Sequence, residues 1–178
     1  MKPNSLQGLY VEQLRDLYDA EHQIIKALPE MIDEATSTDL KDALSEHLET
    51  TKTQATRREQ IFSASGEKSK GEKCKGMQGV IQEGSDLIDD IDDEDVRDAA
   101  IIASAQRLEH YEMAGYGTAR TYAKLLGDDN AGELLQQTLD EEKEGDRKLT
   151  ALAEDINVSA SSGTTSTERT TNTKKRVA

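Results

Sequence analysis

Apolar residues follow a helical period through most of the first 157 residues of the chain. From Ser5 to Ala35 they recur every three or four positions, and the same spacing continues in a second segment that ends before Gly66. A half-buried strand would instead alternate apolar and polar residues. We therefore predict two long helices divided by the capping sequence Thr36-Ser37-Thr38, and this short division makes them antiparallel neighbours.

The second half of the chain shows the same period after a polar loop. Residues 63–76 are rich in Gly, Lys and Ser, and a short helix is expected after them. We predict a long helix from about Glu94 to Leu126 and a last helix from Ala131 to Ile156. A connection this long can cross the bundle and leave the two middle long helices parallel, as in ferritin-like proteins. The predicted fold is all-α, a ferritin-like four-helix bundle whose crossover contains a short fifth helix.

Composition strengthens the all-α prediction and excludes a membrane-spanning protein. Only two prolines occur, Pro3 and Pro29, while Ala, Leu, Glu, Lys and Gln are common. The longest charge-free apolar stretch, residues 99–106, is far below the about 20 residues that a spanning helix needs. No secretory signal is visible, and the single Cys74 cannot form an internal disulfide. We therefore expect a cytoplasmic protein.

The net charge of −14 bears on partners. An acidic surface repels phosphates, so we expect no nucleic-acid partner. Residues 158–178 differ from the rest because they are rich in Ser, Thr and Asn and lack an apolar period. We predict that they form a disordered tail outside a bundle of residues 1–157.

Charged residues interrupt the apolar stripe near the middle of every long helix. The inward candidates are Glu21 in the first helix, His47 in the second, Glu109 and Glu112 in the third, and Glu142 and Asp146 in the last. Several buried carboxylates at one level need cations, protons or metal. Five carboxylates and one imidazole suit two divalent or trivalent metal ions, with iron favoured and manganese as the other choice. The alternative is that some of these acids are exposed, or pair with Arg107, Arg58 or Lys143.

Several motifs resemble one known family. They are Tyr-Asp-Ala-Glu-His at 18–22, His-Leu-Glu at 47–49, Glu-His-Tyr-Glu-Met-Ala-Gly-Tyr-Gly-Thr at 109–118 and Thr-Leu-Asp-Glu-Glu-Lys at 138–143. In this order they resemble the YciE/YciF family of ferritin-like, stress-associated proteins, over about residues 5–155. The resemblance implies a helical bundle, a homodimer and a metal pair at the bundle centre.

The chain departs from the wider ferritin-like pattern, which carries a Glu-x-x-His motif on each of two helices. Thr50 lies three residues after His47, and Gly145 lies three residues after Glu142. Glu49 replaces His47 as a ligand if the second helix is rotated by about half a turn, since the two lie ~200° apart on the helix.

Two functions follow from these residues. The first is a dimetal-carboxylate protein that handles iron, oxygen or peroxide under stress, with an oxidoreductase or ferroxidase-like reaction left open. The second is a metal-free dimeric helical scaffold that uses the same fold for interaction.

Overall fold

A computed structural model describes residues 4–69 and 73–173, with side chains described as far as residue 162. Within these ranges every regular element is a helix, which confirms the all-α prediction. The helices are α1 (Leu6–Glu34), α2 (Thr38–Ser65), α3 (Lys75–Asp89), α4 (Glu94–Leu125) and α5 (Asp129–Thr173).

The first two helices begin and end where local chemistry requires. The Ser5 hydroxyl accepts a hydrogen bond from the Gly8 backbone N–H at 3.0 Å and caps α1. Gly66 ends α2 with φ of 70°, a left-handed conformation that glycine adopts without a steric penalty. The buried Asp98 of α4 accepts hydrogen bonds from the backbone N–H groups of Thr36 and Ser37, at 2.8 and 2.7 Å, and so fixes the loop between α1 and α2.

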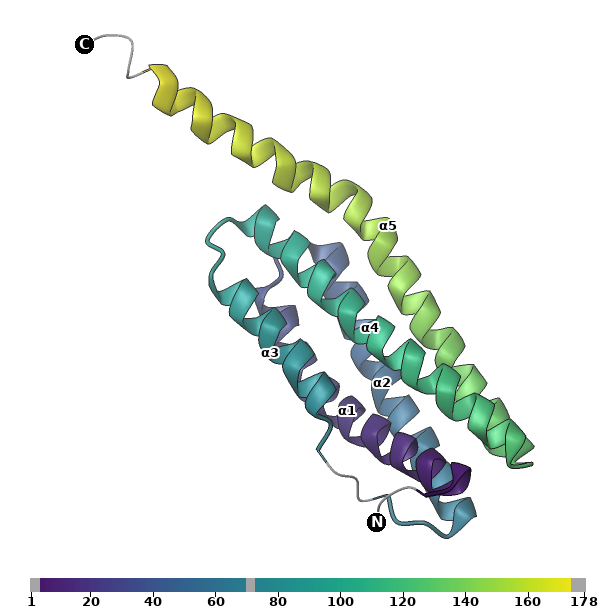
Figure 1. The fold of residues 1–178 in the computed structure, drawn as a ribbon. Helices are drawn as coiled ribbons and strands as arrows, with labels where there is room; N and C mark the ends of the chain where they lie inside the picture. Colours follow the sequence, from purple (N-terminus) through teal and green to yellow (C-terminus); the bar gives the residue numbers. More distant parts are fainter. Residues whose placement is uncertain (1–3, 70–72, 174–178) are drawn as a thin grey trace.

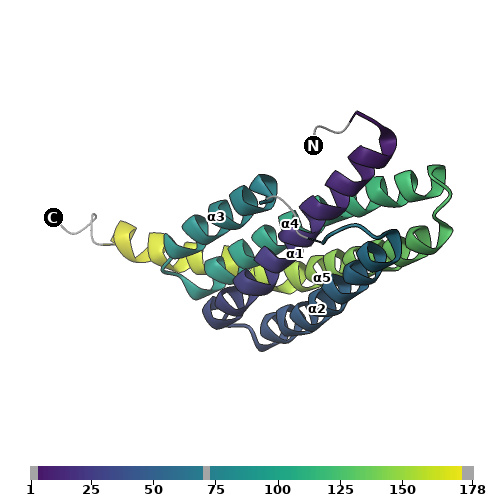
Figure 2. The ribbon, with the colours of Figure 1, turned by 90° about the horizontal axis from the view of Figure 1, so that it is seen from below.

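The four long helices form a bundle in which α1 and α5 each pack against both α2 and α4 (Figures 1 and 2). The shared clusters of buried residues show that α2 and α4 run in the same direction. The shorter α3 packs along α4 and α1 and returns the chain to the end of the bundle where α4 begins. This is the crossover predicted from the long connection, and the ferritin-like prediction is confirmed.

Two apolar clusters fill the bundle, one toward each end. The first contains Leu28, Leu40 and Ile102, and the second contains Leu14 and Phe62. Each of the four long helices contributes to both clusters, and most of the buried polar side chains lie between them along the helices. A layer of buried charged residues therefore lies between two apolar regions, near the middle of the bundle.

The last helix is longer than predicted. The sequence indicated an end at Ile156, whereas α5 continues to Thr173 and its last turns project beyond the bundle (Figure 1). No proline interrupts this segment, and the Ser161 hydroxyl donates to the Val158 carbonyl at 2.8 Å within the helix. Helical backbone therefore continues where no apolar stripe marks it. Residues 174–178 lie outside the described residues, and the division of the chain at residue 157 stays a prediction.

None of the described helices combines the length and apolar character that crossing a membrane requires.

Candidate metal centre

Four glutamates meet in the charged layer, and all are buried. They are Glu21 of α1, Glu109 and Glu112 of α4, and Glu142 of α5, and none is more than 1% exposed. Removing carboxylates from water is costly unless a cation, a proton or a metal ion compensates their charge. The inward positions predicted for these four residues are the positions that the structure shows.

Three of the predicted ligands come together from three helices. His47 of α2, Glu109 of α4 and Glu142 of α5 each offer one donor atom, and these atoms all lie within 4.8 Å of one another. His47 Nδ1 is 3.4 Å from Glu109 Oε1. Ligands on opposite sides of a first-row metal ion lie about 4 Å apart, twice a bond of about 2.1 Å. Small side-chain movements are therefore enough for the three donors to bind one ion.

Gly145 explains one departure from the ferritin-like pattern. A Cβ atom built on Gly145 would lie 2.9 Å from Glu109 Oε1 and 3.2 Å from its Cδ. The missing side chain thus leaves the space into which the Glu109 carboxylate fits against α5. At the position where the wider pattern has a histidine, α5 has Gly145, and the Glu109 carboxylate of α4 occupies the space beside it.

Unpartnered oxygens show that this carboxylate group fits a metal. Glu109 Oε2, Glu142 Oε2 and both carboxylate oxygens of Glu112 are buried with no hydrogen-bond partner among the described residues. Burial raises the pKa of Glu109 and Glu112 well above the usual range, and neighbouring carboxylates raise both further. Burial also raises the pKa of Glu142, to about 7. These groups hold protons that a bound cation would displace.

His47 is suited to ligation in the same way. Its side chain is 13% exposed, and burial lowers its pKa to about 4. The imidazole is therefore neutral near pH 7, and the neutral ring is the form that binds metals.

Glu21 has a different partner. Arg58 of α2, itself 1% exposed, donates from Nη2 to Glu21 Oε1, and the Tyr116 hydroxyl donates to the same oxygen. The Arg58 guanidinium also lies 4.9 Å from the centroid of the Tyr116 ring. Burial raises the pKa of Glu21 to about 7 against the attraction of Arg58. The ion pair with Arg58, one of the alternatives open in the sequence, is thus present for this acid.

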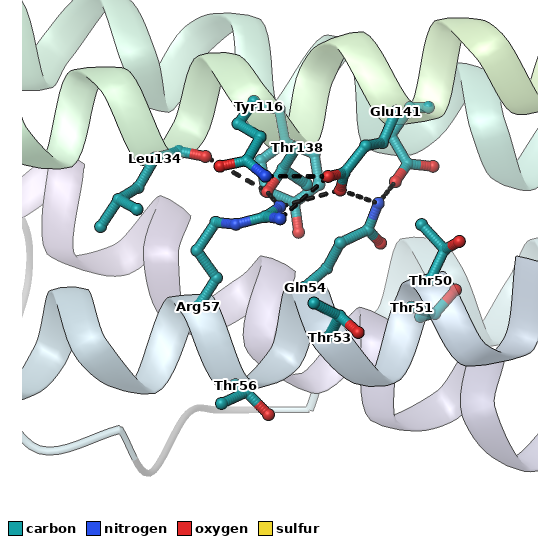
Figure 3. A network of polar contacts seen from close by, with 12 residues as sticks. Thr50, Thr51, Thr53, Gln54, Thr56, Arg57, Tyr116, Leu134, Thr138 and Glu141 are labelled. Carbon is teal, nitrogen blue, oxygen red and sulfur yellow. Dashed lines mark hydrogen bonds and ion pairs between the residues drawn. The ribbon is translucent and has the colours of Figure 1, made fainter.

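A polar network supports the centre from α2 (Figure 3). Gln54 Nε2 donates to Glu142 Oε1 and, at 3.2 Å, to Glu141 Oε2. Arg57 binds the same Glu141 carboxylate through two nitrogens, at 2.8 and 2.9 Å, and reaches Thr138 Oγ1 at 2.6 Å. The network fixes one candidate ligand through Gln54 and joins α2 to α5.

Gln54 contacts a candidate ligand and was not predicted from the sequence. It lies seven residues after His47, two turns farther along the same face of α2. That spacing is present in the sequence, but an uncharged amide is a weaker signal of a metal site than a carboxylate.

Asp146 and Glu49 are not among the three donors that meet. Asp146 is half-buried, and its Oδ1 accepts from Gln106 Nε2 at 3.0 Å and lies 3.3 Å from His110 Nε2. Glu49 is exposed and pairs with Lys52 at 2.6 Å, so the alternative in which Glu49 replaces His47 is wrong.

A cavity leads to the centre between α2 and α5. Its volume is about 450 Å³, and His47, Glu109 and Gly145 line it together with Glu46, Glu144 and Lys148. A metal ion or a small molecule can therefore approach His47 and Glu109 from this side.

Comparison with known proteins agrees with the resemblance found in the motifs. Residues 5–161 match a family described as a domain of unknown function, DUF892. The Escherichia coli K12 protein YciF is 42% identical over 154 residues, which are 86% of this chain and 93% of YciF. The crystal structure of the E. coli stress protein YciF matches with a TM-score of 0.83 at 40% identity, covering 86% of this chain and 97% of that one.

Two further structures match. YcfI, described as a putative structural protein from Rhodopseudomonas palustris, has a TM-score of 0.82 and 43% identity, over 84% of this chain and 95% of that one. A protein from Xanthomonas campestris has a TM-score of 0.69 at 19% identity, over 86% of this chain and 94% of that one, and shares the fold. The family match covers most of the chain and the curated relative is closely similar, so this protein belongs to the DUF892 family, of the YciF type.

Proposed function

We propose that this protein binds a first-row metal ion at His47, Glu109 and Glu142 and handles iron, oxygen or peroxide under stress. The observation that carries the proposal is the meeting of these three donors from three helices within 4.8 Å. Hard carboxylate oxygens with one imidazole nitrogen suit iron or manganese. The description of YciF as a stress protein supports the physiological setting.

The chain's own residues supply position and environment. Gln54 holds the Glu142 carboxylate, and Gly145 leaves room for that of Glu109. The two apolar clusters exclude water from the layer on both sides, while the cavity beside His47 admits small molecules. A bound iron or manganese ion would supply Lewis acidity and electron transfer.

The proposal extends to a homodimer in the cytoplasm, on the basis of the family resemblance and the single cysteine. The charge of −14 argues against a nucleic-acid partner.

Metal analysis of the purified chain tests the metal site. Protein produced with added iron or manganese and purified without chelator should carry bound metal, whereas Glu142→Ala should lose most of it. Glu133→Ala, at an exposed position on the same helix, serves as the matched control and should keep the wild-type content. Equal metal content in all three proteins would overturn the assignment of the ligands.

A metal-free scaffold is the second candidate, and two observations favour it. Arg58 neutralises Glu21, and burial raises the pKa of Glu109 and Glu112, so protons and one guanidinium can satisfy the layer. The Rhodopseudomonas palustris relative is described as a putative structural protein. If wild-type protein neither retains metal nor gains thermal stability with excess Fe(II) or Mn(II), the scaffold function is the correct one.

A further inference from the structure

Arg58 lies in the charged layer, where the sequence predicted two metal ions. Its side chain is 1% exposed and donates to Glu21, and its guanidinium stacks near the Tyr116 ring. Arginine keeps its positive charge in proteins, so the group is a permanent cation built into the bundle. Its Nε and Nη1 atoms are buried without a partner among the described residues, and Glu21 is the acid with which it forms an ion pair.

The donors that remain for a second ion are incomplete. In the charged layer, the buried acids other than Glu109 and Glu142 are Glu21 and Glu112, and Glu21 already binds Arg58. The other two histidines do not join them. His22 Nδ1 lies 2.7 Å from the Tyr18 carbonyl oxygen, and the His110 side chain is 66% exposed. A second ion would therefore have only carboxylates as donors, and it would share one of them with the Arg58 guanidinium.

The buried charges balance with one ion. Arg58 compensates Glu21, and one divalent ion compensates Glu109 and Glu142. Glu112, both of whose oxygens are unpartnered, then keeps a proton and is neutral. Two divalent ions beside Arg58 would bring five positive charges to four carboxylates. Uncompensated charge in a buried layer is unfavourable, whichever its sign.

We infer that the centre takes one divalent metal ion, at His47, Glu109 and Glu142, and that the Arg58 guanidinium fills the place of a second cation beside Glu21. This inference rests on the proposed function, since it fixes how many ions the proposed site holds and where. It differs from the metal pair that the sequence predicted.

Titration of apo protein with Mn(II), following free Mn(II) by electron paramagnetic resonance, counts the ions directly. Wild type should bind one Mn(II) per chain. Arg58→Gln removes the guanidinium and releases Glu21, so it should bind two, with the spectrum of an exchange-coupled pair. Arg58→Lys keeps a positive charge at the same position and should still bind one. Circular dichroism establishes that each variant is folded.

A second variant keeps the inference testable if Arg58→Gln does not fold. Glu112→Gln replaces an acid that we expect to keep its proton, so it should still bind one Mn(II), with a Kd within about tenfold of wild type. A two-ion centre would instead lose one of its two ions in this variant.

The outcomes separate the inference from the proposed function. Two ions in wild type, or one ion in a folded Arg58→Gln, would overturn the inference and leave the metal-binding function standing. No binding in wild type would overturn both and favour the scaffold.

Discussion

Replacing Glu142 with Gln should stabilise the metal-free protein, although the same change removes a metal ligand. Glu142 is fully buried, and burial holds its pKa at about 7, against 4.5 for an ordinary glutamate. The folded chain therefore binds this proton more tightly than the unfolded chain. Between pH 4.5 and pH 7 the folded chain holds this proton and the unfolded chain does not, so the free energy of unfolding falls as pH rises. Above pH 7 both states have lost the proton, and the free energy of unfolding falls no further.

The size of the effect follows from these two pKa values. At about 1.4 kcal/mol per pH unit, ionisation of the carboxyl lowers the free energy of unfolding by about 1 to 2 kcal/mol at pH 5.5 and by about 3 kcal/mol at pH 8. Glutamine has no such proton, and its side-chain oxygen can still accept the hydrogen bond from Gln54. Glu142→Gln should therefore gain about 3 kcal/mol over wild type at pH 8, and about half of that at pH 5.5.

Urea denaturation in the presence of a chelator, followed by circular dichroism, measures this difference. With a slope of about 2 kcal/mol per molar urea, the midpoint at pH 8 should rise by about 1.5 M. Glu133→Gln, at an exposed position on α5, should change stability by less than about 0.5 kcal/mol at either pH. With excess metal the order should invert, because the ion stabilises only a chain that binds it. Wild type more stable than the variant at pH 8 without metal would refute the reasoning.

Three further predictions concern the α1–α2 loop, the space beside Glu109 and the C-terminal segment. Asp98→Ala should lower the free energy of unfolding by about 2–4 kcal/mol in a urea titration, because the hydrogen bonds that fix the α1–α2 loop end on this buried carboxylate. Gly145→Ala should weaken metal binding in a titration, because the added Cβ displaces the Glu109 carboxylate. Gly117→Ala is the control: an added Cβ there meets no atom within 4 Å, so the metal affinity should not change and the free energy of unfolding should rise by up to about 1 kcal/mol. Deletion of residues 158–178 should leave the melting temperature almost unchanged in a calorimetric scan, and a loss of several degrees would show that the segment packs.

The helices were largely predictable because apolar spacing and capping residues agree with each other. Ser5 and Gly66 mark the start of α1 and the end of α2 both in the sequence and in the structure. The end of α5 was not predictable in this way, since the sequence of residues 158–173 carries no apolar stripe that would mark a helix. The structure therefore adds the most where helical backbone continues beyond the apolar stripe.

The inward acids were predictable from the same period, but their partners were not. Glu142 and Asp146 lie only about 40° apart on one helix, yet the first is fully buried and the second lies at the edge of the bundle. Their difference depends on which neighbouring helix covers each position. The choice of Arg58 over Arg107 or Lys143 as the partner of Glu21 likewise depends on which side chains meet at one level of the bundle.

The charged layer between the two apolar clusters has a consequence for how the bundle moves. Apolar burial holds each end together, whereas the layer between them gains little from that source and depends on its cations. The stability of the charged layer therefore depends on pH and on bound metal, unlike that of the two apolar clusters. Without metal at alkaline pH, the layer should open locally, so amide hydrogen exchange should become fastest midway along the helices. A bound ion should couple the two halves so that they unfold as one cooperative unit.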